Sequence, residues 1–327
     1  MRTQRRCLVL AGCATLLALP SAALSKKHHR LGVLSIDDNP VDPIWIEFLL
    51  EMARLGLTEG YDFTVVPSFV GRDGKTAEDA AQELVAHKVD AIYVSGGTGV
   101  VKAAMKATST IPIVMLTSAD PVRDGLVASL RRPDGNVTGN AVLAPELLAK
   151  RLQFLVEITR RPRKVAFLTT ASSPIATRPE MRAALDAKAK SMDTSAQVFP
   201  IASIDELDSV IQEISRSGLP LMADSTALFY INVKRLGELV VQNRVPAIGD
   251  GRRYAEAGFL VAYGLDYHDL ARRCARFIAK IFQGADPGKL PVELANKFDL
   301  VLNLRTATRL GIGVPKNFIS GATAIIR

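Results

Sequence analysis

The chain has 327 residues, of which 48% are hydrophobic and 23% are charged. This length allows one large α/β domain or two domains of ordinary size, and the composition excludes disordered, collagen-like and coiled-coil proteins. Outside the N-terminus no segment approaches the roughly 18 to 20 uninterrupted apolar residues that span a bilayer, which excludes a polytopic membrane protein.

The N-terminus has the pattern of an export signal. Arg2, Arg5 and Arg6 form a basic region, residues 7–19 are apolar, and residues 20–23 form a small-residue stretch that suits a signal peptidase. We therefore expect residues 1–25 to be a signal peptide and the mature protein to be located in the periplasm.

Two other export patterns overlap with this segment. Arg5 and Arg6 resemble a twin-arginine signal, and residues 10–13 resemble a lipoprotein box. Cleavage before Cys13 would leave only residues 7–10 as the apolar core, which is short for a signal peptide. A lipid-anchored form is therefore the less favoured alternative.

The mature chain would keep a single cysteine, Cys274, so it would have no internal disulfide and would depend on its core for stability. The signal contains three arginines and no acidic residue, so its removal lowers the net charge from +8 to +5. The densest basic cluster, residues 160–164, is predicted to be a solvated turn. Because no aromatic residues are interleaved with it, we expect no nucleic-acid partner.

From residue 30 onward, β-branched runs alternate with amphipathic segments, which is typical of an α/β protein with parallel sheets. Asp42 and Pro43 are expected to begin the first helix and Gly56 to end it. In the first half the pattern predicts strands over 31–36, 63–70, 91–95 and 111–117, and helices after Asp42 and over 77–87 and 100–108.

The same pattern then begins again, which predicts a second lobe. Strands are expected over 164–169, 197–201, 220–223 and 245–248, and helices over 145–158, 179–191, 204–217 and 231–243. A helix over 267–282 could pack back on the first lobe, and a strand over 297–304 could cross once more. The predicted lobes are residues 26–139 plus 265–296 and residues 140–264 plus 297–327, with passages near residues 139, 260 and 297.

Small polar residues stand where these strands end, which is where open parallel sheets bind ligands. No histidine or cysteine is among them, so they describe a recognition cleft better than a catalytic centre. Some are also expected to cap the helices that follow. The candidate ligand-binding residues are Ser35, Ser95, Gly96, Gly97, Thr98, Thr117, Ser118, Asp120, Thr170, Asp224, Ser225 and Asp250.

The sharpest local feature is the glycine-rich loop over residues 96–99, because the helix that follows it would favour an anionic group. A dinucleotide fingerprint is a rival interpretation, but Lys102 stands at the position of its third glycine. The four histidines are scattered in the sequence. We therefore predict no cofactor, no metal and no catalytic residues, and we expect Trp45 to be a core residue.

Several longer stretches resemble one family, the bacterial ABC-transporter substrate-binding proteins of the tryptophan/tyrosine type. The resemblance implies a type I periplasmic-binding-protein fold, with two Rossmann-like lobes joined by a multi-strand hinge that close on a small molecule. Two departures concern the ligand: Glu51 replaces a usual glycine, and Asp224 is followed by serine where many amino-acid binders have asparagine. The stretches are residues 31–35, 106–114, 120–122, 125–130, 133–139 and 297–304.

The resemblance predicts a monomeric, non-enzymatic binding protein that passes its ligand to an inner-membrane ABC permease and its ATPase. The ligand stays open among amino acids, aromatic acids and other small carboxylates. A periplasmic sensor for a membrane receptor is an alternative. A periplasmic enzyme is a weaker one, since no catalytic residue is evident in the cleft.

The export signal gives a direct prediction. N-terminal sequencing of the exported protein should give a first residue between Leu24 and Lys27. A mature chain that begins at a lipidated Cys13 would instead show that the lipoprotein box directs processing.

Overall fold

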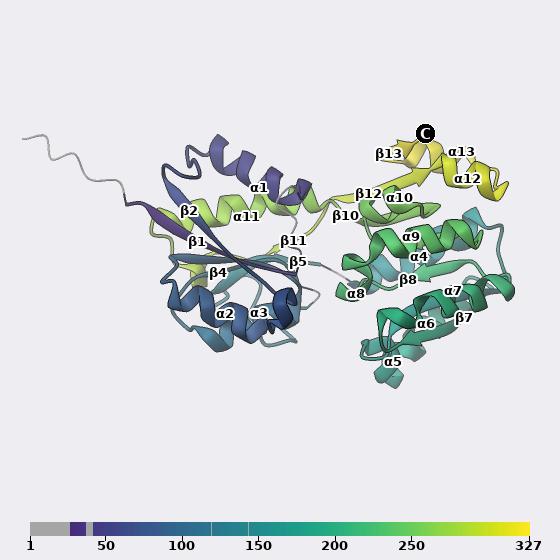
Figure 1. Cartoon of the computed structure of the whole chain (residues 1–327), viewed down its shortest axis with the longest axis horizontal. Helices are drawn as coiled ribbons and strands as arrows, with labels where there is room; N and C mark the ends of the chain where they lie inside the picture. Colours follow the sequence, from purple (N-terminus) through teal and green to yellow (C-terminus); the bar gives the residue numbers. More distant parts are fainter. Residues whose placement is uncertain (1–26, 37–41, 119, 143) are drawn as a thin grey trace, which may run out of the picture.

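The computed structural model describes residues 27–36, 42–118, 120–142 and 144–327, and the predicted signal peptide lies outside these ranges. The chain forms two sheets that lie side by side along the long axis of the molecule, each covered by helices (Figure 1). Of the helices in the described ranges, none combines the length and the apolar character that a bilayer span needs.

The first sheet and its helices are called lobe 1. Its six strands have the order β11-β5-β4-β3-β1-β2, and every pairing is parallel. Helices cover both faces, which explains why the central strands are continuous apolar runs. The strands are β1 (His29–Ser35), β2 (Phe63–Phe69), β3 (Ala91–Ser95), β4 (Ile113–Ser118), β5 (Val137–Ala141) and β11 (Glu293–Leu294), and the helices are α1 (Pro43–Arg54), α2 (Ala77–Ala86) and α3 (Thr98–Ala107).

The second sheet and its helices are called lobe 2. The seven strands have the order β13-β12-β10-β9-β8-β6-β7, and β12 runs antiparallel to β10. The strands are β6 (Lys164–Thr170), β7 (Ser195–Ile201), β8 (Leu221–Ala223), β9 (Ala247–Gly249), β10 (Val261–Leu265), β12 (Phe298–Asn303) and β13 (Ala324–Ile326). The helices are α4 (Ala144–Ile158), α5 (Pro174–Thr177), α6 (Pro179–Lys190), α7 (Leu207–Arg216), α8 (Ala227–Ile231), α9 (Val233–Gln242), α10 (Arg252–Ala257), α12 (Leu304–Leu310) and α13 (Lys316–Gly321).

Most predicted elements are present within a few residues of their expected bounds. Asp42 caps α1 through a hydrogen bond from the backbone N–H of Ile44, with Pro43 as the first helical residue. Trp45 is partly buried in the core and stacks on Phe48, with ring centroids 4.9 Å apart.

Two of the expected elements differ from the structure. The predicted helix over 231–243 is α9, and a separate short helix that was not predicted, α8, precedes it; the two are divided at Asn232, which leaves the helical conformation and donates its side-chain amide to the carbonyl of Leu228. Residues 136–139 were expected to be only a passage between lobes, yet β5 passes through the interior of sheet 1. Its Gly139 lies so close to β4 that an added Cβ would be 2.2 Å from the carbonyl oxygen of Met115.

The chain passes between the sheets three times: between β5 and α4, between β10 and α11 (Tyr267–Phe282), and between β11 and β12. As expected, α11 returns to lobe 1, where it packs beside α1 (Figure 1). Its Cys274 is buried and accepts a hydrogen bond from the side-chain amide of Asn140 in β5. Desolvation raises the pKa of this thiol.

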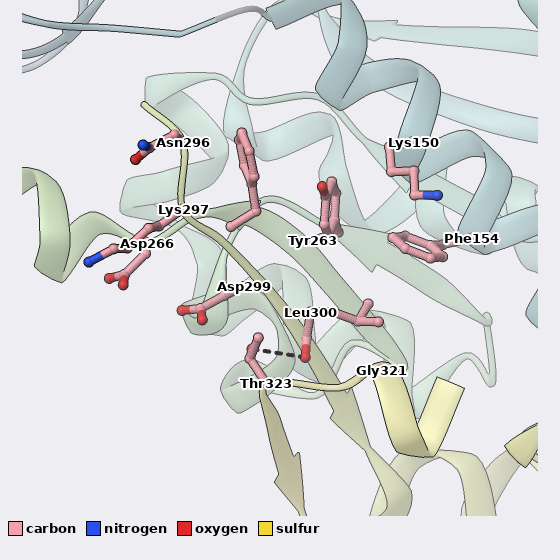
Figure 2. A pocket seen from close by; sticks show the side chains of 11 residues that line it. Lys150, Phe154, Tyr263, Asp266, Asn296, Lys297, Asp299, Leu300, Gly321 and Thr323 are labelled. Carbon is pink, nitrogen blue, oxygen red and sulfur yellow. Dashed lines mark hydrogen bonds between the residues drawn. The ribbon is translucent and has the colours of Figure 1, made fainter. Parts of the chain in front are cut away.

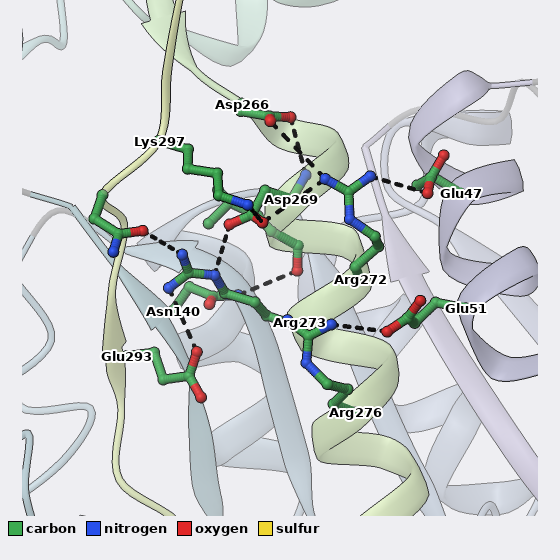
Figure 3. Close-up of polar contacts among 12 residues, drawn as sticks. Glu47, Glu51, Asn140, Asp266, Asp269, Arg272, Arg273, Arg276, Glu293 and Lys297 are labelled. Carbon is green, nitrogen blue, oxygen red and sulfur yellow. Dashed lines mark hydrogen bonds and ion pairs between the residues drawn. The ribbon is translucent and has the colours of Figure 1, made fainter. Parts of the chain in front are cut away.

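Charged side chains of α11 connect these passages, and we call the group the hinge ion cluster (Figure 3). Asp269, whose side chain is 6% exposed, receives Arg273 Nε and Lys297 Nζ, each at 2.7 Å. Because Asp269 follows the second passage and Lys297 lies in the third, this contact joins the two passages. The cluster comprises Glu47, Glu51, Asp266, Asp269, Arg272, Arg273, Arg276, Glu293 and Lys297.

Glu51 has a structural role that the sequence did not reveal. The replacement of the usual glycine by Glu51 was expected to bear on the ligand. The Glu51 carboxylate instead lies 2.8 Å from Arg276 Nη1 and joins α1 to α11. Glu51 is also not among the residues that line the cavity described below.

The cluster makes stability sensitive to Asp269. We expect Asp269→Asn to lower the free energy of unfolding by about 3 kcal/mol, because it leaves the mostly buried Arg273 without its nearest counter-charge. Asp186→Asn is a matched control, since Arg182 and Asp186 have the same four-residue spacing but side chains that are 41% and 49% exposed. The free energy of unfolding of this control variant should fall by only about 0.5 kcal/mol. Similar losses for the two variants in a urea titration would contradict the prediction.

Asp269 should also make the stability of the protein depend on pH. Burial would raise the pKa of Asp269, but hydrogen bonds from Lys297 and Arg273 outweigh it and hold the pKa below its usual value. A depressed pKa stabilises the folded state above about pH 4, the value for a free aspartate, and this stabilisation is lost as the pH falls further. The difference in stability between the wild type and Asp269→Asn should therefore shrink below pH 4.

Candidate functional site

A cavity of about 900 Å³ lies between the two lobes. It is bounded by the carboxyl ends of β3 and β4 on one side and by the loops after β6, β8 and β9 on the other. The last residues of the strands that lead into the three passages, Ala141, Leu265 and Leu294, also line it. Its position at the strand ends agrees with the rule for open parallel sheets, and its volume lies in the usual range for small-molecule sites.

The wall from lobe 1 includes the backbone at the start of α3, beside side chains such as Thr117, Asp120 and Arg123. Gly97 precedes the helix with a φ of +75°, a conformation that suits glycine, and no side chain caps the helix there. The Thr98 hydroxyl lies 3.4 Å from Asp124 Oδ2 as a donor. The N–H groups of this turn and the positive end of the α3 dipole therefore favour an anionic ligand group.

The wall from lobe 2 contains Asp224, at the end of β8. Its carboxylate accepts hydrogen bonds from the hydroxyls of Thr169 and Ser173, at 2.6 and 2.8 Å, and from the backbone N–H of Ser225. The helix that follows is capped by Thr226, so Asp224 is not its cap. Among the described residues, no lysine, arginine or histidine forms an ion pair with Asp224, and its negative charge is held by hydrogen bonds alone.

Asp250, at the end of β9, differs because Arg151 neutralises it. Arg151 is 5% exposed, and its Nη2 lies 2.6 Å from Asp250 Oδ1. Its other nitrogens donate to the hydroxyl of Ser225 and to the carbonyl of Tyr263. Tyr267, the first residue of α11, places its hydroxyl 3.5 Å from the other oxygen of Asp250.

Arg151 was not among the predicted site residues, although the sequence contains a signal for it. Arg151 stands four residues from both Leu147 and Leu155, which are buried, so a charged residue occupies the apolar side of the predicted helix 145–158. Three tyrosines that line the cavity were also missed, because two lie on the short helices α8 and α10 and the third lies at the lobe passage. They are Tyr230, Tyr254 and Tyr267.

The structure brings most of the candidate ligand-binding residues to this one cavity, and whether they bind a ligand stays a prediction. Those that line it are Ser95, Gly96, Gly97, Thr98, Thr117, Asp120, Asp224, Ser225 and Asp250. Ser35 is buried at the end of β1 and does not line it. Thr170 lies apart, 3.4 Å from Ser172, and Ser173 lines the cavity in its place. For Ser118, the side chain lies outside the described part of the chain.

A second pocket, of about 600 Å³, lies beside the passages and shares no residue with the cavity (Figure 2). Aromatic rings form part of its lining: Tyr263 lies 5.0 Å from Phe154 and 6.0 Å from Phe298 between ring centroids. Because the carbonyl of Tyr263 accepts a hydrogen bond from Arg151, β10 connects this second pocket with the cavity wall.

Solved structures share this architecture. A conserved domain protein from Vibrio cholerae has a TM-score of 0.79 at 24% identity, covering 91% of this chain and all of that one. A protein from Streptococcus pneumoniae in complex with L-Trp has a TM-score of 0.78 at 20% identity, covering 92% of this chain and all of that one. With the more distant glucose-galactose binding protein from Geobacillus stearothermophilus, at a TM-score of 0.55, they confirm the predicted type I periplasmic-binding-protein fold.

Sequence comparisons point the same way. A tyrosine-binding protein from Clostridioides difficile (strain R20291) is 24% identical over 287 residues, which cover 88% of this chain and 82% of that protein. The family model described as ABC transporter substrate binding protein matches residues 70–326. Since this match spans most of the chain, the protein belongs to the ABC transporter substrate-binding protein family.

Proposed function

We propose that the protein is exported to the periplasm, binds an amino acid in the cavity between its lobes and delivers it to an ABC permease and its ATPase. The observation that carries the proposal is the charge arrangement of the cavity. One wall presents the N-terminus of α3, and the other presents Asp224 without an ion-pair partner among the described residues. An amino acid has one anionic and one cationic group, which is the complement of this pair.

The ligand carboxylate would lie at residues 95–98, held by backbone N–H groups, and the ammonium group would lie at Asp224. A charge enclosed between closing lobes needs a partner, because burying it unpaired is costly. Asp250 is less suited to this role, because Arg151 already neutralises it. The tyrosine rings and the apolar residues of the cavity, such as Leu147 and Met181, would contact the side chain of the ligand.

An aromatic amino acid is the first candidate to test. The relative from Clostridioides difficile is named a tyrosine-binding protein, and the Streptococcus pneumoniae structure contains L-Trp. Tyr230 and Tyr267, which line the cavity and are partly exposed, offer ring surfaces against which an aromatic ligand can pack. We further propose that the protein acts as a monomer, uses no cofactor and catalyses no reaction.

Asp224→Asn tests the proposal, since it keeps the shape of the side chain and removes its charge. Affinity for L-tyrosine or L-tryptophan should fall about 10-fold to 100-fold, because a hydrogen bond to a charged group is lost. Affinity for the deaminated analogue of the same amino acid should change little. Isothermal titration calorimetry on the wild type and the variant, with both ligands, measures the four values.

Asp208→Asn is the control, because it removes the same charge from an exposed ion pair with Arg235 on lobe 2, outside the cavity lining. It should leave both affinities unchanged. Equal losses for the amino acid and its deaminated analogue in Asp224→Asn would show that Asp224 does not bind the ammonium group.

A further inference from the structure

The edge of sheet 2 that faces away from the cavity carries a group of basic side chains. The carboxyl ends of β6, β8 and β9 border the cavity, and because these strands and β7 are parallel, their amino ends lie on the opposite edge. The carboxyl end of β12, which is antiparallel to β10, lies on that edge too and leads into α12. Figure 1 shows α12 at the end of the molecule farthest from lobe 1. We call the basic residues of these connections the basic edge: Arg160, Arg161, Arg163, Lys164, Lys190, Arg216, Arg244 and Arg309.

Contacts between the connections hold the basic edge together. Arg244 Nη2 donates to the carbonyl of Arg309 at 3.0 Å, and the hydroxyl of Ser215 joins the end of α7 to the end of α9. Arg160 reaches the segment after α12, where a Cβ on Gly313 would be 3.7 Å from its Nη2. The basic residues come from separate parts of the chain and occupy one surface.

The connections carry far more positive than negative charge. They contain the eight basic residues and a single acid, Asp193, which gives a net charge of +7. The chain after the predicted signal has a net charge of +5, so the rest of it carries −2. The charge of the protein is therefore concentrated at one end. The connections are residues 159–164, 190–195, 216–220, 243–247 and 308–313.

The basic edge has no counter-charge of its own. All eight side chains are exposed, and within the described ranges no ion pair includes any of them. Basic residues in the last turn of a helix interact favourably with its dipole, which accounts for one residue each in α6, α7 and α12. The dipoles do not account for four cations within residues 160–164. Their mutual repulsion would be relieved by an anionic partner.

The surface fits a broad anionic partner better than a small molecule. None of the eight residues lines either of the two cavities described above. The large apolar side chains that are exposed in the described part of the chain lie outside these connections. The edge therefore offers dispersed charge without an apolar anchor, which suits adsorption to a charged bilayer and not insertion into it.

We propose that the basic edge is a docking surface for an anionic lipid bilayer, such as one that contains phosphatidylglycerol. Each basic side chain near such a surface strengthens binding about 5-fold. Adsorption would hold the protein at the membrane that carries the proposed permease. Because the basic edge lies opposite the cavity side of sheet 2, the adsorbed protein can still bind its ligand. The inference goes beyond the proposed function and does not depend on the identity of the ligand.

Vesicle co-sedimentation tests the inference with residues 26–327, which contain every described element. The protein should bind vesicles of phosphatidylcholine mixed with phosphatidylglycerol and should not bind vesicles of phosphatidylcholine alone. Raising the salt concentration from about 0.1 M to about 1 M should abolish binding, because the Debye length falls from about 10 Å to about 3 Å.

The triple variant Arg161→Gln/Arg163→Gln/Arg216→Gln removes three charges of the basic edge. Its affinity for the anionic vesicles should fall about 100-fold, at about 5-fold for each residue. These three side chains donate no hydrogen bond to any described residue, so the melting temperature should stay close to that of the wild type. If this variant melts much lower, Lys164→Gln/Lys190→Gln replaces it, with an expected fall of about 25-fold.

The triple variant Lys88→Gln/Lys102→Gln/Arg131→Gln is the matched control. Its three residues are exposed on lobe 1 and line neither cavity, and their loss changes the net charge by the same amount. The control should bind anionic vesicles like the wild type. Equal losses in the two triple variants would show that adsorption follows the net charge and would overturn the inference.

The remaining results separate a bilayer from other partners and the inference from the proposed function. A wild type that does not bind anionic vesicles overturns the inference, even if a polyglutamate resin retains it, which would indicate an acidic protein partner. Both triple variants should bind L-tyrosine or L-tryptophan like the wild type. Amino-acid binding without vesicle binding would leave the proposed function standing, and vesicle binding without amino-acid binding would leave the inference standing.

Discussion

The contact on which the cavity most depends is the ion pair between Arg151 and Asp250. An arginine that is almost fully buried needs acceptors for its guanidinium, and Arg151 finds them in Asp250, Ser225 and the carbonyl of Tyr263. These acceptors come from three segments of lobe 2, so the side chain ties α4 to β10 and to two cavity loops. The pair also affects the charge of the site, because it neutralises Asp250, whereas Asp224 in the same wall has no ion-pair partner among the described residues.

The passages between the lobes also affect the site. The second passage ends in α11, whose first residue, Tyr267, reaches Asp250 from the side of lobe 1. Further along the helix, Arg272 and Arg276 fix α11 to α1 through ion pairs with Glu47 and Glu51. The helix is thus attached to lobe 1 and touches the charged wall of lobe 2, so a change in the angle between the lobes must alter the contact between Tyr267 and Asp250.

Strong local signals made much of the fold predictable. Apolar runs of five to seven residues, capped helix starts such as Asp42-Pro43, and the helical period of residues 267–282 each require little tertiary information. The strand β5 could not be recognised, because Gly139 and Asn140 are unusual in a strand centre. They are tolerated because Asn140 donates a hydrogen bond to the carbonyl of Leu116 and because Gly139 allows close contact with β4.

The residues of the candidate site likewise divide into those that the sequence could predict and those that it could not. Residues at strand ends were found because parallel topology brings those ends together. Arg151 and Tyr254 were not, because their positions depend on how a helix face and a short helix pack in three dimensions. Glu51 is the opposite case: a sequence difference was connected with the ligand, whereas the side chain joins two helices and is not among the residues that line the cavity.

The buried state of Cys274 has a practical consequence for measuring lobe closure. Thiol-reactive dyes attack the thiolate, and burial in lobe 1 both raises the pKa of this group and hides it from reagents. In a chain that begins after the proposed signal, a cysteine introduced on either rim of the cavity would be labelled selectively while Cys274 is retained. A donor and an acceptor fluorophore on the two rims could then report the distance between the lobes, in a protein whose hinge and core are unaltered.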